Sequence, residues 1–191
     1  MASERDYEGT ELELFQAAVN WKAYWSDKVA PYVRGAALEV GAGLGANIAN
    51  FRGKSDVQWT LLEPDRAMCE EMSGRARAGL LPPGTEVVCG MLGDLPAGRT
   101  YDSILYIDVL EHIEDDDGEL AVSLQLLRPG GKLCLFVPAL PGLYSSIDHK
   151  SGHFRRYTKK SLQTRVERAG FEVETIDYFD VASVVPYWLL Y

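Results

Sequence analysis

The sequence predicts an α/β fold with a doubly wound, mostly parallel sheet of six or seven strands and helices on both faces. Three observations lead to this prediction. Short apolar runs alternate with helix-like segments along most of the chain, which is typical of a parallel sheet. The first run passes directly into a turn with glycines at alternate positions, and an acid, Glu63, closes the second run. A chain of 191 residues without internal repeats predicts one domain over 1–191.

Composition narrows the class of protein. With 47% apolar and 25% charged residues the chain reads as an ordinary globular protein. The formal charge of −9, from 28 acids against 19 lysines and arginines, argues against a nucleic-acid partner, although basic residues gather between 150 and 168. Three cysteines without C-x-x-C spacing predict neither a disulfide framework nor a metal site. A polar, acidic N-terminus and the lack of an apolar run of roughly 18 residues predict no secretion signal, no membrane span and a cytoplasmic location.

The expected elements follow in order along the chain. A first helix over 11–33 carries an apolar face with Trp21 and Trp25. Strands are expected at 36–40, 58–63, 86–89, 103–107, 132–137 and 171–179, with a short helix directly after the glycine turn. Further helices are expected from Pro64 to Gly79, after the acidic run 114–117, and from the N-cap Thr158 to Gly170.

The C-terminal stretch 181–191 is apolar and contains no clear seventh strand. Three interpretations remain open for it. The native chain continues further, or the stretch packs in place of the missing strand, or it forms a contact surface, including one for a homodimer.

The glycine turn is the first functional signal. Gly41, Gly43 and Gly45 allow positive φ angles in a tight strand-to-helix turn, and a missing Cβ lets a flat ligand lie against the backbone. The spacing fits a dinucleotide fingerprint as well as a G-x-G-x-G turn. Glu39 favours the second, because a dinucleotide fold normally places an apolar residue there. Glu63, at the end of the next strand, can accept both hydroxyls of a ribose.

Five segments together resemble the class I S-adenosylmethionine-dependent methyltransferases, in particular small-molecule enzymes similar to those of ubiquinone biosynthesis. They are LEVGAGLG (38–45), LLEPD (61–65), YDSILYIDVLEHIED (101–115), LLRPGGKLCLFVP (126–138) and GHFRRYT (152–158). They stand in the family's order over about four-fifths of the chain. The resemblance implies a Rossmann-like fold, S-adenosylmethionine as cofactor, and a small-molecule methyl acceptor on oxygen, nitrogen or carbon.

The resemblance also implies where the cofactor lies. The glycine turn would hold the methionine moiety, Glu63 the ribose, and the residues after the third strand the adenine, while the first helix would cover the cleft. Many relatives have Gly-Asp where this chain has Gly90 and Met91, so the usual acid for adenine is absent. The expected cofactor-binding residues are Glu39, Gly41, Ala42, Gly43, Gly45, Asn47, Glu63, Pro64, Met91, Leu92 and Asp108.

The long loop after the fifth strand is the expected acceptor side, because it leaves the sheet at the same edge as the cofactor crevice. Its candidate catalytic residues are His149 and His153, with His149 as general base made more basic by Asp148. An alternative for each histidine, and for His112, is a purely structural role. The expected acceptor-side residues are Tyr144, Arg155, Arg156 and Tyr157.

Two other functions remain as alternatives. A nicotinamide-dependent oxidoreductase would use a similar glycine turn, but Glu39 and the PGG sequence before the fifth strand argue against it. A non-catalytic nucleotide-binding or interaction domain of the same fold would instead use the apolar C-terminal stretch as its contact surface.

Overall fold

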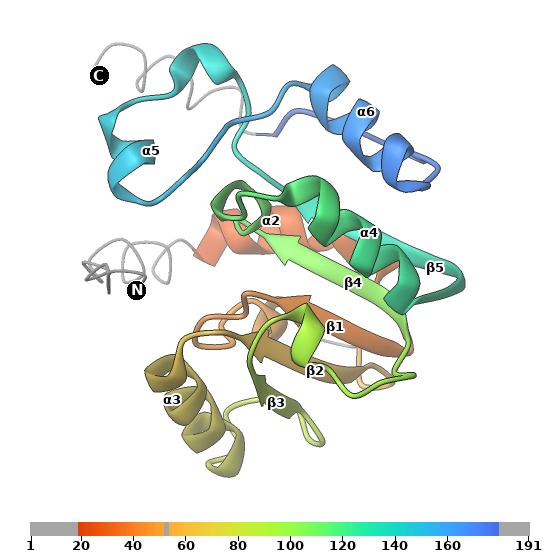
Figure 1. Ribbon diagram of the computed structural model, residues 1–191. Coiled ribbons are helices and arrows are strands. Elements are labelled where there is room, and N and C mark those ends of the chain that lie inside the picture. Colours follow the sequence, from red (N-terminus) through yellow and green to blue (C-terminus); the bar gives the residue numbers. More distant parts are fainter. Residues whose placement is uncertain (1–18, 52–53, 180–191) are drawn as a thin grey trace.

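The computed structural model describes residues 19–51 and 54–179. Within them, five strands form one parallel sheet in the order β3-β2-β1-β4-β5 (Figure 1). The strands are β1 (Ala36–Val40), β2 (Gln58–Glu63), β3 (Glu86–Cys89), β4 (Tyr101–Ile107) and β5 (Leu127–Phe136). The strand order reverses between β1 and β4, the position where such sheets bind ligands at their carboxyl edge.

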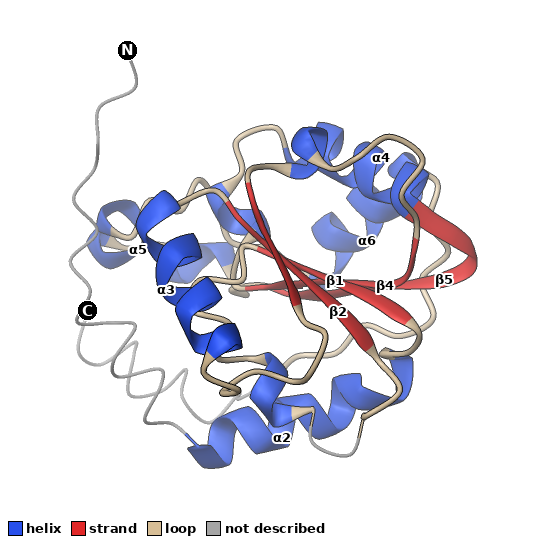
Figure 2. Ribbon diagram, turned by 90° about the horizontal axis from the view of Figure 1, so that it is seen from below, coloured by secondary structure: helices blue, strands red, loops and turns tan. Residues whose placement is uncertain are grey.

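Helices cover both faces of the sheet, as the sequence predicted (Figure 2). They are α2 (Val19–Val29), α3 (Arg66–Arg77), α4 (Asp116–Leu126), α5 (Ser146–Lys150) and α6 (Lys159–Ala169). Short 3-10 turns lie at Ala30–Tyr32, Ile48–Asn50, Leu92–Asp94, Leu110–His112 and Pro141–Leu143. No helix in the described ranges has both the length and the apolar character needed to cross a bilayer.

Helices α3 and α6 begin at side-chain caps, α3 two residues after its predicted start at Pro64 and α6 directly after the predicted N-cap Thr158. The Asp65 carboxylate accepts a hydrogen bond from Met68 N at 2.8 Å at the start of α3, next to Pro64. Thr158 accepts from Ser161 N at 3.0 Å at the start of α6, and Gly170 ends that helix with φ 104°. These bonds satisfy backbone groups that a helix end leaves unpaired.

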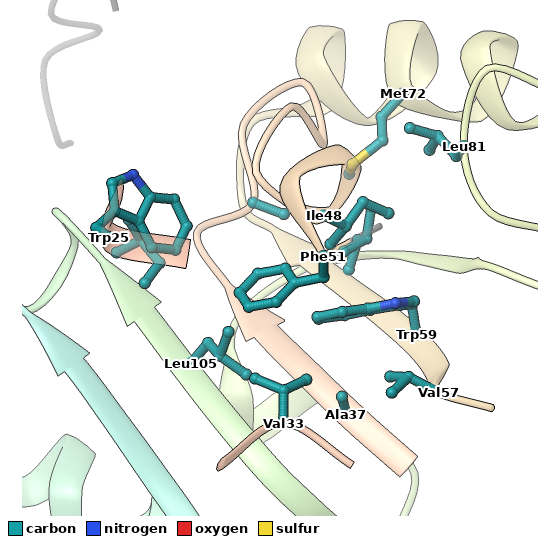
Figure 3. Close-up of a cluster of buried hydrophobic side chains, with 13 residues drawn as sticks. Trp25, Val33, Ala37, Ile48, Phe51, Val57, Trp59, Met72, Leu81 and Leu105 are labelled. Carbon is teal, nitrogen blue, oxygen red and sulfur yellow. The ribbon is translucent and has the colours of Figure 1, made fainter. Parts of the chain in front are cut away.

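Alternate residues of the central strands enter two separate cores. Ala37 on β1 and Leu105 on β4 face the α2 and α3 side, where Trp25 packs against Phe51 with ring centroids 5.8 Å apart (Figure 3). Leu38, which follows Ala37, and Ile104, which precedes Leu105, face the opposite core. This alternation follows from the two-residue period of a strand, and it buries both faces of β1 and β4.

The predicted sixth strand is wrong. Residues 171–179 lie beside β5, where Glu174 contacts Lys132 and Phe179 contacts Phe136. They form no backbone hydrogen-bond ladder with β5. Phe171 packs on the α4–α6 side, whereas Phe179 packs on the α2 side. A regular strand would place both on one face, because they are an even number of residues apart. Among residues 19–51 and 54–179 the sheet therefore has five strands, fewer than the six or seven predicted.

Two other expected elements differ or lie outside the described residues. In place of the expected helix after the glycine turn, the described residues up to Phe51 form a single 3-10 turn, Ile48–Asn50. The first helix begins at Val19 in the described part of the chain. Residues 11–18 of its predicted span and the C-terminal stretch 181–191 lie outside the described residues.

Candidate functional site

The glycine turn leaves an open space beside one of its three glycines. Gly41 (φ 65°) has no room for a side chain, because a Cβ would lie 2.6 Å from Cγ2 of Val109. Gly45 (φ 68°) is nearly as crowded, with Leu61 3.0 Å from a Cβ. Gly43 (φ 57°) has no heavy atom within 4 Å of that position. The turn is therefore packed against β2 and the segment that follows β4, but it is open at Gly43.

Glu39 is a buried acid with only one oxygen satisfied. Its side chain is 1% exposed, and Oε1 accepts a hydrogen bond from Asn47 Nδ2 at 2.8 Å. Oε2 is buried and has no partner among the described residues. Burial raises the pKa of Glu39 to about 7, although the Asn47 hydrogen bond lowers it. An unsatisfied buried carboxylate oxygen is costly, and a ligand with a cationic donor would satisfy it.

Glu63 fastens the glycine turn to the end of β2. Oε2 accepts from Gly43 N at 2.8 Å, and Oε1 accepts from Asp65 N at 3.0 Å. Burial raises the pKa of this carboxyl, while the two backbone bonds lower it. Each oxygen still has acceptor capacity for a ligand hydroxyl. Ala42 beside it is buried, with its N–H bound to Leu62 O at 3.0 Å, and Pro64 is exposed.

The residues after β3 divide into one exposed and one buried side chain. Met91 is 61% exposed, whereas Leu92 is 5% exposed and packs in the core on the α4 side. Asp94 folds back, and its Oδ2 accepts from Met91 N at 2.8 Å. Asp94 therefore belongs to the turn, and Met91 is the side chain left available to a ligand.

The end of β4 carries two unusual acids. Asp108 has a left-handed φ of 54°, a conformation that is strained for a residue with a side chain. Its side chain is exposed, yet desolvation by the surrounding protein raises the pKa of Asp108 to about 7. Glu111 is 1% exposed, and neither of its carboxylate oxygens has a partner among the described residues. Burial, followed by the charge of Asp108, raises the pKa of Glu111 to about 9.

Two histidines meet beside Glu111. The rings of His112 and His153 lie 4.6 Å apart between centroids, at 89° to each other. Burial, followed by the proximity of His153, lowers the pKa of His112 to about 4. His153 Nδ1 lies 3.0 Å from Oδ1 of Asp148.

Asp148 is the centre of the loop after β5, and its histidine partner differs from the one predicted. The carboxylate accepts from Arg156 at 2.7 and 3.0 Å and from Ser145 N at 2.8 Å. Burial alone would raise the pKa of Asp148, but these bonds and the one with His153 hold it at about 2. Asp148 therefore supports His153 instead of the predicted His149, whose side chain is exposed on α5.

The predicted acceptor-side residues are mostly part of the framework. Tyr157 is 2% exposed, and its hydroxyl donates to Asp116 Oδ2 at 2.9 Å. Arg155 pairs with the same carboxylate at 2.7 Å and donates to Glu114 O at 2.7 Å. These contacts attach the loop to the start of α4, and they bury the predicted acceptor-side residue Tyr157 in the framework. Tyr144 is 40% exposed, with its hydroxyl donating to His153 O at 2.7 Å.

A separate hollow of about 630 Å³ lies at the amino ends of the strands. Its walls include Ala36 and Gln58, the first residues of β1 and β2, and the ion pair of Arg99 with Glu86. It is at the opposite end of the sheet from the glycine turn and contains none of the predicted site residues.

The sequence did not predict that Glu111 and His112 meet His153. The acid-histidine pair lies at the end of β4 and His153 in the loop after β5, and no local spacing connects them. The tertiary bonds from this loop to residues 110–116 bring them together, including Phe154 N to Glu111 O at 2.8 Å.

Comparison with known proteins identifies the family. Residues 20–176 match a family model described as a methyltransferase domain, and a comparison with curated proteins found no match. Among solved structures, the chain is similar to a phosphoethanolamine N-methyltransferase of Haemonchus contortus in complex with S-adenosyl-L-methionine (14% identity, TM-score 0.75, 99% of this chain and 49% of that one). It is also similar to the [4+2]-cyclase SpnF (24%, TM-score 0.69, 86% and 62%) and to the YcgJ protein of Bacillus subtilis (18%, TM-score 0.63, 78% and 67%).

The structural likenesses show the fold, and the chain spans only 49 to 67% of these three structures. The family match is more specific, because it covers most of the chain and includes the glycine turn, both strand-end acids and the loop after β5. The chain belongs to the family of methyltransferase domains, whose methyl donor is S-adenosylmethionine.

Proposed function

We propose that this chain transfers a methyl group from S-adenosylmethionine to a small-molecule acceptor, on an oxygen, nitrogen or carbon atom, at the carboxyl edge of the sheet. The observation that carries the proposal is the buried, unpaired Oε2 of Glu39 beside the open space at Gly43. An apolar core would not keep such an oxygen without a donor partner. The cofactor's ammonium group is a partner of the right charge.

The residues present fit this cofactor, which supplies a methyl group on a positively charged sulfur. Glu39 would accept from its ammonium group, and the open backbone at Gly43 would lie against it. Glu63 would receive the ribose hydroxyls while it holds the turn in place. Met91, as the exposed side chain after β3, would cover the adenine by apolar contact. Asp108 would border the same crevice from the neighbouring strand.

The acceptor would enter between the glycine turn and the loop 144–157. Methyl transfer depends chiefly on alignment of the reactants, and this loop is fixed by Asp148, Arg155 and Tyr157. His153 is the loop histidine that we assign to the reaction, because Asp148 fixes its ring through Nδ1. His149, exposed on α5, has no comparable support.

We extend the proposal to the whole chain as one catalytic domain over 1–191 that works in a reducing compartment such as the cytoplasm. The free state of its three cysteines is consistent with such a compartment. The role of 181–191 as a contact surface, for a second copy or another protein, stays a prediction.

Calorimetric titration with S-adenosylmethionine, and separately with NAD, tests the cofactor. We expect binding of the first only. Glu63→Ala should weaken it roughly ten- to a hundredfold, because a carboxylate bonding to hydroxyls contributes about 1.5–3 kcal/mol. Glu70→Ala is the matched control, since Glu70 is an exposed acid on α3 with 77% of its side chain accessible.

Turnover is tested by incubation with a panel of phenols, amines and carbon acids, with the demethylated cofactor as the measured product. Product formation with one acceptor class identifies the acceptor atom. Unchanged affinity in a folded Glu63→Ala protein would show that the cofactor is not held as proposed.

A further inference from the structure

Three side chains with metal-binding atoms converge at the carboxyl edge of the sheet. Glu111 and His112 lie in the 3-10 turn that follows β4, and His153 lies in the loop that follows β5. Their candidate ligand atoms all lie within 4.8 Å of one another. The glycine turn is next to them, because Val109, two residues before Glu111, fills the space at Gly41.

The buried carboxyl group of Glu111 is independent evidence that this cluster binds a ligand. Its side chain is 1% exposed, and both carboxylate oxygens lack a hydrogen-bond partner among the described residues. Buried acids in proteins are nearly always paired or bound to a metal, since burial of an isolated carboxylate costs several kcal/mol or more. A cation between Glu111 and the two imidazoles would satisfy these oxygens.

The outer contact of His153 is typical of a metal ligand. His153 Nδ1 is bound to Asp148, which is itself fixed by Arg156 and the Ser145 backbone. His112 lies close to the same loop, because a Cβ at Gly152 would lie 3.8 Å from its Nδ1. The protein thus holds one ring nitrogen of His153, and the other would be the ligand atom. Such outer partners orient the ring and raise its basicity at metal sites.

We propose that Glu111, His112 and His153 form a binding site for one divalent first-row metal ion, with Zn²⁺, Co²⁺ and Mn²⁺ as the fitting class. One carboxylate and two imidazoles suit these ions better than Ca²⁺ or Mg²⁺, which prefer all-oxygen ligands. Three protein ligands leave at least one coordination position for water or for an oxygen of a ligand in the adjacent crevice. The site is defined by this chain's residues alone, whereas its link to the acceptor rests on the proposed function.

The experiment uses the full chain without a histidine tag, treated with a chelator and then dialysed. Titration with CoCl₂ is followed by the visible absorption of the bound ion, and titration with ZnCl₂ is followed by calorimetry. We expect one ion per chain. Glu111→Gln and His153→Gln, which keep side-chain size, should each weaken binding at least tenfold.

His149→Gln is the matched control, since this histidine lies four positions from His153 in the chain but is exposed and outside the cluster. It should keep the affinity of the unsubstituted chain. Circular dichroism and melting curves confirm that each variant is folded.

Failure of the unsubstituted chain to bind either ion would overturn the proposal, whatever the variants do. Binding that His149→Gln weakens as much as His153→Gln, or that neither Glu111→Gln nor His153→Gln weakens, would also overturn it and leave Glu111 as a neutral buried acid. A parallel titration with S-adenosylmethionine in the presence of chelator keeps the two proposals separate. Cofactor binding without metal binding refutes the site alone, and metal binding without cofactor binding refutes the proposed function alone.

Discussion

Glu39→Gln should make the ligand-free protein more stable at neutral and alkaline pH while it weakens the cofactor site. The reason is the cost of a buried carboxylate with one unpaired oxygen. Burial raises the pKa of Glu39 from an ordinary value of 4.5 to about 7, and this rise corresponds to a penalty of about 3 kcal/mol on the charged form. Glutamine keeps an oxygen for Asn47 Nδ2, so the existing hydrogen bond is retained.

The pH dependence of the Glu39 charge determines the sign of the stability change expected for Glu39→Gln. Below pH 4.5 Glu39 is protonated in both the folded and the unfolded chain, so no penalty exists. As pH rises from 4.5 to about 7, the unfolded chain loses this proton and the folded chain keeps it, so folding is progressively disfavoured. Above about pH 7 the full penalty applies. The gain in unfolding free energy from Glu39→Gln should therefore be about 3 kcal/mol at pH 8 and about 1 kcal/mol or less at pH 5.

Urea denaturation of both proteins at pH 5 and pH 8, without cofactor, measures this difference. A stability change that is the same at both pH values, or a loss of stability at pH 8, would refute the reasoning. The same variant should bind S-adenosylmethionine at least tenfold more weakly, because its amide cannot balance an ammonium charge. Together the two results would show that the acid is kept for binding at a cost in stability.

Three further predictions concern the turn, the loop and the adenine side. Gly43→Val should abolish cofactor binding in calorimetry while the protein still folds, because the position is open and the positive φ costs only about 1–3 kcal/mol. Asp148→Asn should lower the unfolding free energy by about 3–5 kcal/mol in urea denaturation, because it breaks a buried pair with Arg156. The control is Asp177→Asn, which breaks the exposed pair with Lys159 and should lower the unfolding free energy by under about 1 kcal/mol in the same assay. Met91→Ala should weaken cofactor binding by about 1–3 kcal/mol with an unchanged melting temperature, since the side chain is 61% exposed in the ligand-free chain; a melting temperature that falls instead would mean that Met91 supports the fold.

The sequence by itself determined the features that depend on local patterns. Apolar runs and turn residues were enough to predict a parallel sheet and the approximate positions of β1 to β5, since the period of a strand and the cap of a helix each depend on a few neighbouring residues. Glycines at 41, 43 and 45 were recognisable because all three do adopt positive φ. Glu39 and Glu63 were found because they end strands, and in a parallel sheet the carboxyl ends share one edge.

Only the tertiary structure decided which distant groups meet. Asp148 was expected to support its neighbour His149, but the turn of α5 directs its carboxylate to His153 and Arg156. The predicted sixth strand does not form for a similar reason, because Phe171 and Phe179 pack in different cores on the two sides of the sheet. Side-chain pairing between loops and backbone pairing at a sheet edge depend on packing in three dimensions. Local sequence periodicity carries no information about either.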